Sequence, residues 1–159
     1  MGTPNLNLGC GNDKRGDIRI DITPKKSGVN LVADAHHLPL RNKVINATLC
    51  KSVLEHVESP LKVILEMKRV TKGKMTVIVP NIFNAVRIVK TLMNPLHPVN
   101  PNTWHLQGWD LKLIKHLAIM AGLKLQAAHW LFEKRYSWSF IYGPFTSSHL
   151  GAILTDDTD

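Results

Sequence analysis

The sequence predicts an α/β protein whose core is a mostly parallel sheet of about seven strands flanked by helices. Two observations carry this prediction. Short β-branched or aliphatic segments, bounded by Gly, Pro, Asn or Asp, recur along the chain as strands do. Segments with helical spacing of apolar residues separate the later strands, and this alternation implies parallel strands covered by helices. The chain of 159 residues has the size of one domain, which we place at residues 1–155.

The strands are expected in two groups. Five strands lie in the first half of the chain, over residues 5–8, 17–22, 29–33, 44–50 and 74–79. Alternating apolar and polar residues predict two more strands, over residues 123–127 and 136–142. Residues 156–159 are expected to be a disordered tail.

Three helices are expected between these strands. Ser59 followed by Pro60 is an N-cap with a proline at the first helical position. A second helix is expected over about residues 84–93, before a proline-rich interval. Asp110 caps a third helix, and Gly122 ends it.

Composition excludes several classes of protein. Twenty Lys and Arg against twelve Asp and Glu give a formal net charge of +8, which leaves an anionic partner open. The basic residues are scattered in pairs, however, so a nucleic-acid partner is not favoured. No apolar run approaches the ~18 residues of a membrane span and no signal peptide opens the chain, so we expect no membrane association and a cytoplasmic location. The two cysteines exclude a disulfide framework, and no metal site is expected.

The residues that point to a ligand stand at strand ends. Residues 6–12, Leu-Asn-Leu-Gly-Cys-Gly-Asn, run from an apolar strand into two glycines. Asp21 ends the second strand, where a carboxylate can accept both hydroxyls of a ribose. Asp34 and Ala35 close the third strand and offer an acceptor beside a backbone N–H, which suits the edge of adenine. The alternative is that both acids cap turns.

With these features the sequence resembles the class I S-adenosylmethionine-dependent methyltransferases, and more narrowly a small branch of methyltransferase type 11-like proteins. The resemblance covers nearly the whole chain and implies a Rossmann-like sheet with S-adenosylmethionine as cofactor and S-adenosylhomocysteine as product. The matching stretches are LNLGCGN (6–12), RIDI (19–22), VADAHHLPL (32–40), SVLEHV (52–57), EMKRVTKGKMTVIVPN (66–81) and HLQGWD…AGLKL (105–125).

The resemblance also implies roles for individual residues. The glycine turn would cradle the methionine part of the cofactor, Asp21 would bind the ribose and Ile22 would pack on adenine. The full set of expected cofactor-binding residues is Gly9, Cys10, Gly11, Asn12, Asp21, Ile22, Asp34, Ala35 and Ser52.

One interval departs from the usual pattern of this fold. Only residues 12–16 separate Gly11 from Asp17, whereas a parallel crossover takes a dozen or more residues. We therefore expect the first crossover helix to be shortened or missing. The sheet face beside the first two strands would then be bare, which predicts self-association, as in a homodimer.

Two histidines are candidates for a general base. His56 follows the fourth strand, where the resemblance places residues next to the transferring methyl. The alternative is that His56 and Glu55 only hold their loop. His105 lies between Trp104 and Trp109, in a segment that either forms a lid with aromatic walls for the substrate or packs on the sheet edge.

These observations predict methyl transfer to an unidentified acceptor, more a small molecule than a nucleobase. The Asn/Asp-Pro-Pro-aromatic motif of enzymes that methylate base amino groups is missing after Cys50, and Cys50 itself is expected to be a buried thiol. Two alternatives stay open. One is a catalytically inactive cofactor-binding or structural subunit that acts through a partner, and the other is an RNA methyltransferase, which the positive charge favours.

Overall fold

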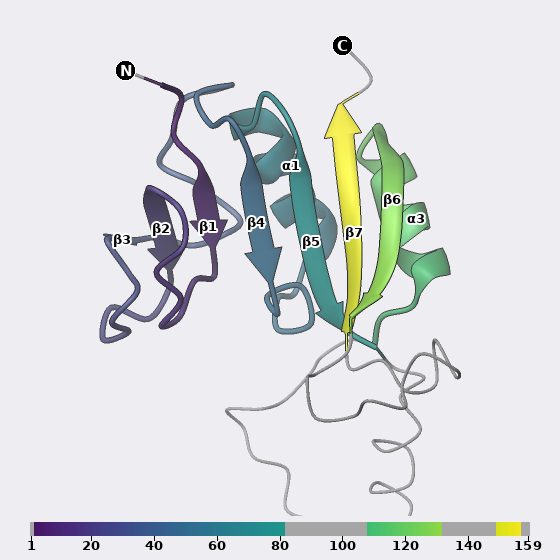
Figure 1. Cartoon of the computed structure of the whole chain (residues 1–159), viewed down its shortest axis with the longest axis horizontal. Coiled ribbons are helices and arrows are strands. Elements are labelled where there is room, and N and C mark those ends of the chain that lie inside the picture. The colour runs from purple at the N-terminus through teal and green to yellow at the C-terminus, as the bar shows by residue number, and fades with distance from the viewer. Residues whose placement is uncertain (1, 82–107, 132–148, 157–159) are drawn as a thin grey trace, which may run out of the picture.

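The computed structural model describes residues 2–81, 108–131 and 149–156. Seven strands form one sheet in the order β3-β2-β1-β4-β5-β7-β6 (Figure 1). Their bounds are β1 Leu6–Leu8, β2 Ile18–Asp21, β3 Leu31–Val32, β4 Thr48–Lys51, β5 Met75–Pro80, β6 Leu123–Leu131 and β7 His149–Asp156. Neighbouring strands from β3 to β5 pair in parallel, and β7 runs antiparallel to both β5 and β6. The predicted mostly parallel sheet is confirmed.

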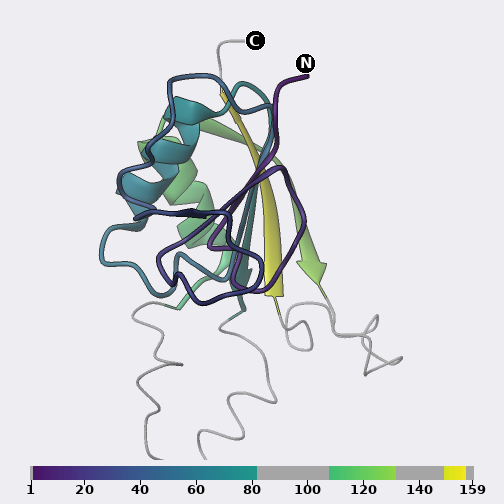
Figure 2. The ribbon, with the colours of Figure 1, turned by 90° about the vertical axis from the view of Figure 1, so that its left-hand side faces the viewer.

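Two helices within the described residues, α1 (Pro60–Val70) and α3 (Leu111–Met120), cover the same face of the sheet (Figure 2). Pro60 stands in the first turn of α1, as predicted. The side chain of Asp110 caps α3 by accepting a hydrogen bond from the Leu113 N–H at 2.7 Å. Neither helix is long and apolar enough to cross a membrane. The helix predicted over residues 84–93 lies outside the described residues.

The hydrophobic core lies between these helices and the sheet. Val63, Ile64, Met67 and Val70 of α1 recur at helical spacing and are fully buried. Cys50 of β4 is buried in the same core, and burial raises the pKa of its thiol to about 12. The prediction of a buried thiol at this position is confirmed.

Residues 9–17, all of which are described, connect β1 to β2 through turns and contain no helix. This connection packs on β1 itself. The Asn7 side chain donates a hydrogen bond from Nδ2 to the Arg15 carbonyl at 3.2 Å and is only 2% exposed. Gly16 lies so close that a Cβ there would be 3.3 Å from the Asn7 backbone nitrogen. The short connection therefore covers β1 at Asn7, and the predicted bare face beside the first two strands is not seen at this position.

The C-terminal part differs from the sequence prediction. The strand predicted over residues 136–142 lies outside the described residues, and β7, which the sequence analysis missed, runs over His149–Asp156. Asp156, expected in the disordered tail, ends β7, and its carboxylate pairs with Lys43 Nζ at 2.9 Å and Lys68 Nζ at 3.3 Å. The strand was missed because Gly151 and Ala152 have low strand propensity and because an interior strand shows no clear alternation.

Candidate functional site

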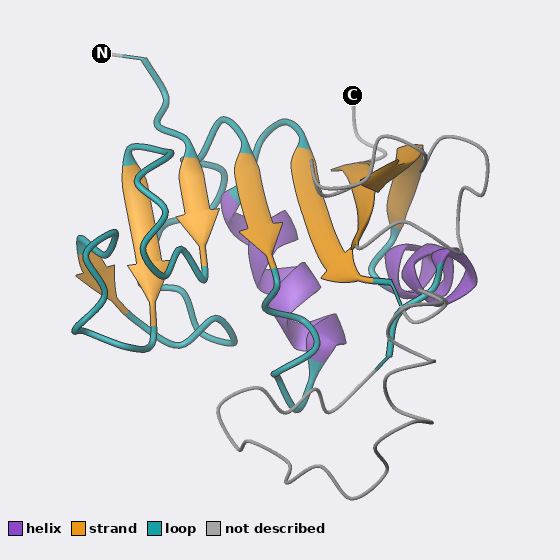
Figure 3. Cartoon of the chain, turned by 60° about the horizontal axis from the view of Figure 1, so that its bottom comes forward, coloured by secondary structure: helices purple, strands orange, loops and turns teal. Residues whose placement is uncertain are grey.

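Most of the predicted cofactor-binding residues lie at one edge of the sheet. Gly9 follows β1, Asp21 ends β2, Asp34 lies just beyond β3 and Ser52 follows β4. Since these strands are parallel, their carboxyl ends point to the same edge, which comes forward in Figure 3. In open α/β sheets this edge is where ligands bind.

The turn after β1 depends on its two glycines. Gly9 has a φ of +66° and Gly11 a φ of +53°, both in the left-handed region that other residues avoid. The N–H groups of Gly9 and Cys10 both donate to the Ile20 carbonyl, at 2.7 and 3.0 Å, so the turn folds back onto β2. A Cβ at Gly9 would lie 2.1 Å from Val53 Cγ2. Glycine is therefore required here both by the backbone and by the approach of the segment after β4.

Asp21 holds two turns at once. Its Oδ2 accepts a hydrogen bond from the Gly11 N–H at 2.8 Å, and its Oδ1 accepts one from the Thr23 N–H at 2.8 Å. The turn-capping alternative for Asp21 is thus present in the structure. A carboxylate has about four acceptor positions, so each oxygen can still accept a ribose hydroxyl.

A polar cluster joins the glycine turn to the loop between β2 and β3. Asn12 Oδ1 accepts hydrogen bonds from the backbone and side chain of Ser27, at 3.1 and 3.3 Å, so this oxygen is already engaged. The Arg19 guanidinium bridges two carbonyls, donating to Gly28 O at 2.5 Å and Gly16 O at 3.0 Å. Sequence reasoning missed Arg19, because nothing in its neighbourhood signals that it joins two loops.

Asp34 caps its own turn. Its Oδ1 accepts from the His36 backbone N–H at 2.9 Å and contacts His36 Nδ1 at 2.7 Å. These contacts lower the pKa of the Asp34 carboxyl. Oδ2 receives no hydrogen bond from the described part of the chain, and Ala35 beside it is half-buried. Asp34 therefore caps the turn with Oδ1 and keeps the acceptor capacity of Oδ2.

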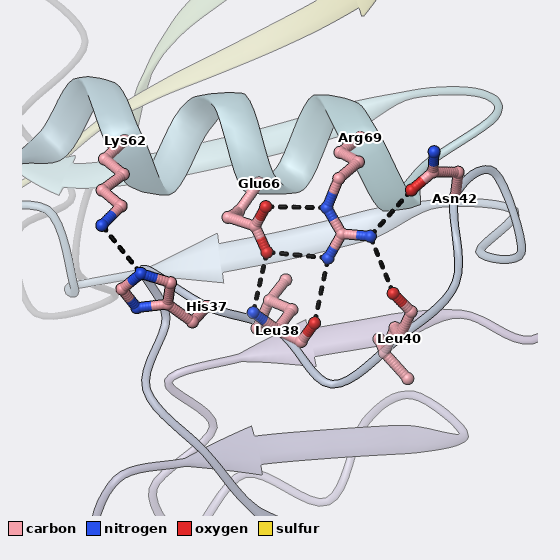
Figure 4. A network of polar contacts seen from close by, with 7 residues as sticks. All are labelled: His37, Leu38, Leu40, Asn42, Lys62, Glu66 and Arg69. Atoms are coloured by element: carbon pink, nitrogen blue, oxygen red, sulfur yellow. Dashed lines mark hydrogen bonds and ion pairs between the residues drawn. The ribbon is translucent and has the colours of Figure 1, made fainter.

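The segment that follows Asp34 is fixed to α1 (Figure 4). Glu66 Oε2 accepts from the Leu38 N–H at 2.8 Å, and Arg69 donates back to the Leu38 carbonyl at 2.9 Å. Arg69 also donates to the Leu40 carbonyl at 2.8 Å and to Asn42 Oδ1 at 2.9 Å. The Arg69 guanidinium, 2.7 Å from Glu66 Oε1, lowers the pKa of the Glu66 carboxyl. Sequence reasoning assigned no role to this pair.

The segment after β4 carries a strained residue and the candidate base. Ser52 has a φ of +54°, and its N–H donates to the Ile78 carbonyl at 2.8 Å. The His56 side chain is 40% exposed, and its Nε2 lies 4.0 Å from Oε1 of the buried Glu55. This distance is too long for a hydrogen bond. His56 is therefore an accessible imidazole with a buried carboxylate beside it.

The remaining predicted residues divide into three groups. Ile22 is 70% exposed directly after β2, as a residue that packs on a ligand instead of the core would be. Trp109 is 2% exposed within the core, and its backbone forms an isolated parallel β-bridge with Asn81. This position favours packing in the core over contact with a substrate. His105 and Trp104 lie outside the described residues. Among the residues that are described, no three His, Cys, Asp or Glu side chains gather as metal ligands.

Comparisons with known proteins identify the same fold in methyltransferases. Residues 18–79 match the family model of a methyltransferase domain. An S-adenosylmethionine-dependent methyltransferase from Thermotoga maritima has the same fold, with a TM-score of 0.75, 17% identity and coverage of 98% of this chain and 84% of that one. Magnesium protoporphyrin IX methyltransferase from Synechocystis, solved with S-adenosylhomocysteine, has a TM-score of 0.67 and 13% identity over 98% of this chain and 74% of its own.

A third similar structure is a methyltransferase from Methanosarcina mazei, with a TM-score of 0.66, 14% identity and coverage of 98% and 94% of the two chains. No curated protein sequence matches this chain significantly. At these identities the structural matches show the fold.

Proposed function

This chain has the fold of the class I S-adenosylmethionine-dependent methyltransferases, and we propose that it binds S-adenosylmethionine and transfers the methyl group to an acceptor. One observation carries the proposal. Two carboxylates that still have acceptor capacity follow neighbouring parallel strands: Asp21 ends β2 and contacts the glycine turn, and Asp34 lies just beyond β3. This is the arrangement that a ribose and an adenine require.

The residues present fit the parts of that cofactor. Asp21 accepts the ribose hydroxyls, and Oδ2 of Asp34 accepts the adenine amino group. The exposed Ile22 side chain packs on the adenine ring, and the methionine part lies against Gly11, where a Cβ would meet no atom within 4 Å. Of the polar atoms in the turn, Asn12 Oδ1 is already used by Ser27, so Asn12 contributes to the site through its backbone or by holding the loop.

The bound cofactor supplies an activated methyl group on a sulfonium. Transfer of such a group requires above all that the acceptor be aligned, and positioning can supply ~7 to 11 kcal/mol of the barrier. His56 is exposed on the segment after β4, where it can take a proton from an acceptor that must lose one. The +8 charge of the chain suits an anionic acceptor.

Titration calorimetry with S-adenosylmethionine and S-adenosylhomocysteine tests the proposal. We expect one site, with affinity reduced in Asp21→Ala and in Asp34→Ala. Asp13→Asn is the control, because Asp13 lies in the connection between β1 and β2 and its carboxylate pairs with Arg15 at 2.9 Å. No heat and no thermal shift at millimolar ligand would contradict the proposal.

Two further measurements separate the alternatives. Binding of S-adenosylhomocysteine without methyl transfer to any acceptor tested, alone or with added cell extract, would favour an inactive subunit. Affinity for RNA that falls steeply with salt concentration would favour an RNA methyltransferase. Self-association also stays a prediction, although β1 is covered by its own connection, and sedimentation velocity at micromolar concentrations tests it.

A further inference from the structure

We propose that His36 is a positioning residue that fixes the carboxylate of Asp34 and thereby gives the site its preference for a purine with a 6-amino group. The inference rests on the proposed function, because it concerns the base subsite of the same cofactor.

The contacts of His36 all fall on one oxygen of Asp34. Its backbone N–H donates to Oδ1 at 2.9 Å, and its ring Nδ1 lies 2.7 Å from the same atom. The last torsion of an Asp side chain is otherwise soft, so a carboxylate without such contacts turns easily about the bond to Cβ. With two donors on Oδ1, the direction of Oδ2 is set.

The imidazole of His36 is largely buried, and Nδ1 is its atom that faces Asp34. Nε2 of His36 is buried and has no hydrogen-bond partner within the described part of the chain, and the side chain is 19% exposed. The Asp34 carboxylate can only accept hydrogen bonds, so the donor in the 2.7 Å contact is the Nδ1–H of His36.

The backbone of this turn does not depend on the His36 ring. The His37 N–H donates to the Asp34 carbonyl at 3.0 Å, and both backbone groups of Leu38 are bonded to the Glu66 and Arg69 side chains (Figure 4). Removing the imidazole should thus release the carboxylate of Asp34 and leave the turn in place.

A fixed acceptor discriminates between bases. Adenine carries an amino group at C6, which donates to an oxygen set in that direction. Hypoxanthine carries a carbonyl oxygen at C6, which the carboxylate repels, and a donor N–H at the neighbouring N1. A carboxylate that is free to turn can follow that N–H, whereas a fixed one cannot. His36 therefore acts on selectivity between bases and not only on affinity.

The experiment is calorimetric titration with S-adenosylhomocysteine and with S-inosylhomocysteine, which differs only in the base. We expect the parent to prefer the adenosyl compound by roughly 10- to 100-fold, the worth of one hydrogen bond to a charged group. In His36→Phe the preference should fall to within about threefold.

Two more variants at this position test the inference if His36→Phe does not fold. In His36→Asn the side-chain amide reaches the position of Nδ1, so the preference should be restored. In His36→Gln the amide stands near the position of Nε2, so the preference should be lost although the residue is equally polar. His37→Phe is the matched control, because the His37 ring contacts Lys62 Nζ at 2.8 Å and makes no hydrogen bond with the Asp34 side chain.

Each remaining outcome overturns the inference. Equal loss of affinity for both compounds in His36→Phe or His36→Gln, with the preference unchanged, would make His36 merely structural. Equal effects of His37→Phe and His36→Phe would assign the preference to the turn. A parent that binds S-adenosylhomocysteine without distinguishing the bases contradicts the role of His36 alone. A parent that binds neither compound contradicts the proposed function itself.

Discussion

The backbone N–H of Gly11 donates a hydrogen bond to Oδ2 of Asp21 at 2.8 Å. This contact ties the turn after β1 to the end of β2. A carboxylate predicted to bind a ribose therefore also holds the turn expected to receive the methionine part of the cofactor. Substitutions of Asp21 are therefore expected to change both cofactor affinity and the free energy of unfolding.

Asp21→Ala should weaken binding of S-adenosylhomocysteine by roughly 2 to 4 kcal/mol, because charge-assisted hydrogen bonds to two hydroxyls are lost. It should also lower the free energy of unfolding, since the N–H groups of Gly11 and Thr23 lose their acceptor. Asp21→Asn keeps one acceptor oxygen, so it should lower the free energy of unfolding only slightly while still weakening cofactor binding clearly. Calorimetry and urea unfolding measure the two effects. Unchanged affinity in the alanine variant would leave Asp21 as a turn cap alone.

The two glycines of the turn should respond differently to alanine. Gly11→Ala meets no atom within 4 Å, so it should cost only the left-handed backbone, about 1 to 2 kcal/mol. Gly9→Ala carries the same backbone cost and also forces its methyl group to within 2.1 Å of Val53 Cγ2 unless Val53 moves. It should therefore destabilise more. Adding Val53→Ala should restore part of the stability lost in Gly9→Ala. Urea unfolding of the parent, the two single variants and the double variant forms a double-mutant cycle that measures this coupling.

Acid should destabilise the protein through two paired carboxylates. Arg69 lowers the folded-state pKa of Glu66, and Lys43, with Lys68, lowers that of Asp156. The unfolded chain then binds more protons, so this stabilisation is fully present above the unfolded pKa values near ~4 and is lost as the pH falls through the lower folded values. Urea unfolding at several pH values measures this effect. The double variant Glu66→Gln/Asp156→Asn should lose less unfolding free energy between neutral and acid pH than the parent does. Glu58→Gln, at an exposed position outside both ion pairs, is the control for the loss of a negative charge.

Both thiols should be unreactive in the folded protein. Cys50 is buried and its pKa is raised to about 12, while burial, with a contribution from Asp21, raises the pKa of Cys10. Reaction requires an accessible thiolate, so a thiol reagent at pH 8 should label neither residue until urea unfolds the chain. Fast labelling of Cys10 in the native protein would show that the glycine turn opens.

Much of the site could be predicted because its signals are local. Neighbouring residues and their spacing are enough to predict three features. These are a strand that runs into two glycines, an acid at the end of the second strand, and an acid beside Ala35 after the third. Parallel pairing then brings them to one edge. The capping of α3 by Asp110 and the burial of Cys50 are equally local consequences of residue type and pattern.

The sequence by itself determined the parallel sheet, the glycine turn and the strand-end acids, because each follows from a short pattern. Only the tertiary structure decided which side chains hold these elements in place. Arg19 bridges two loops, Glu66 receives the N–H of a residue 28 positions away, and Lys43 pairs with Asp156 across 113 positions. A hydrogen bond needs two groups within ~3 Å in space, and no spacing along the chain encodes that distance for residues brought together by the packing of a whole sheet.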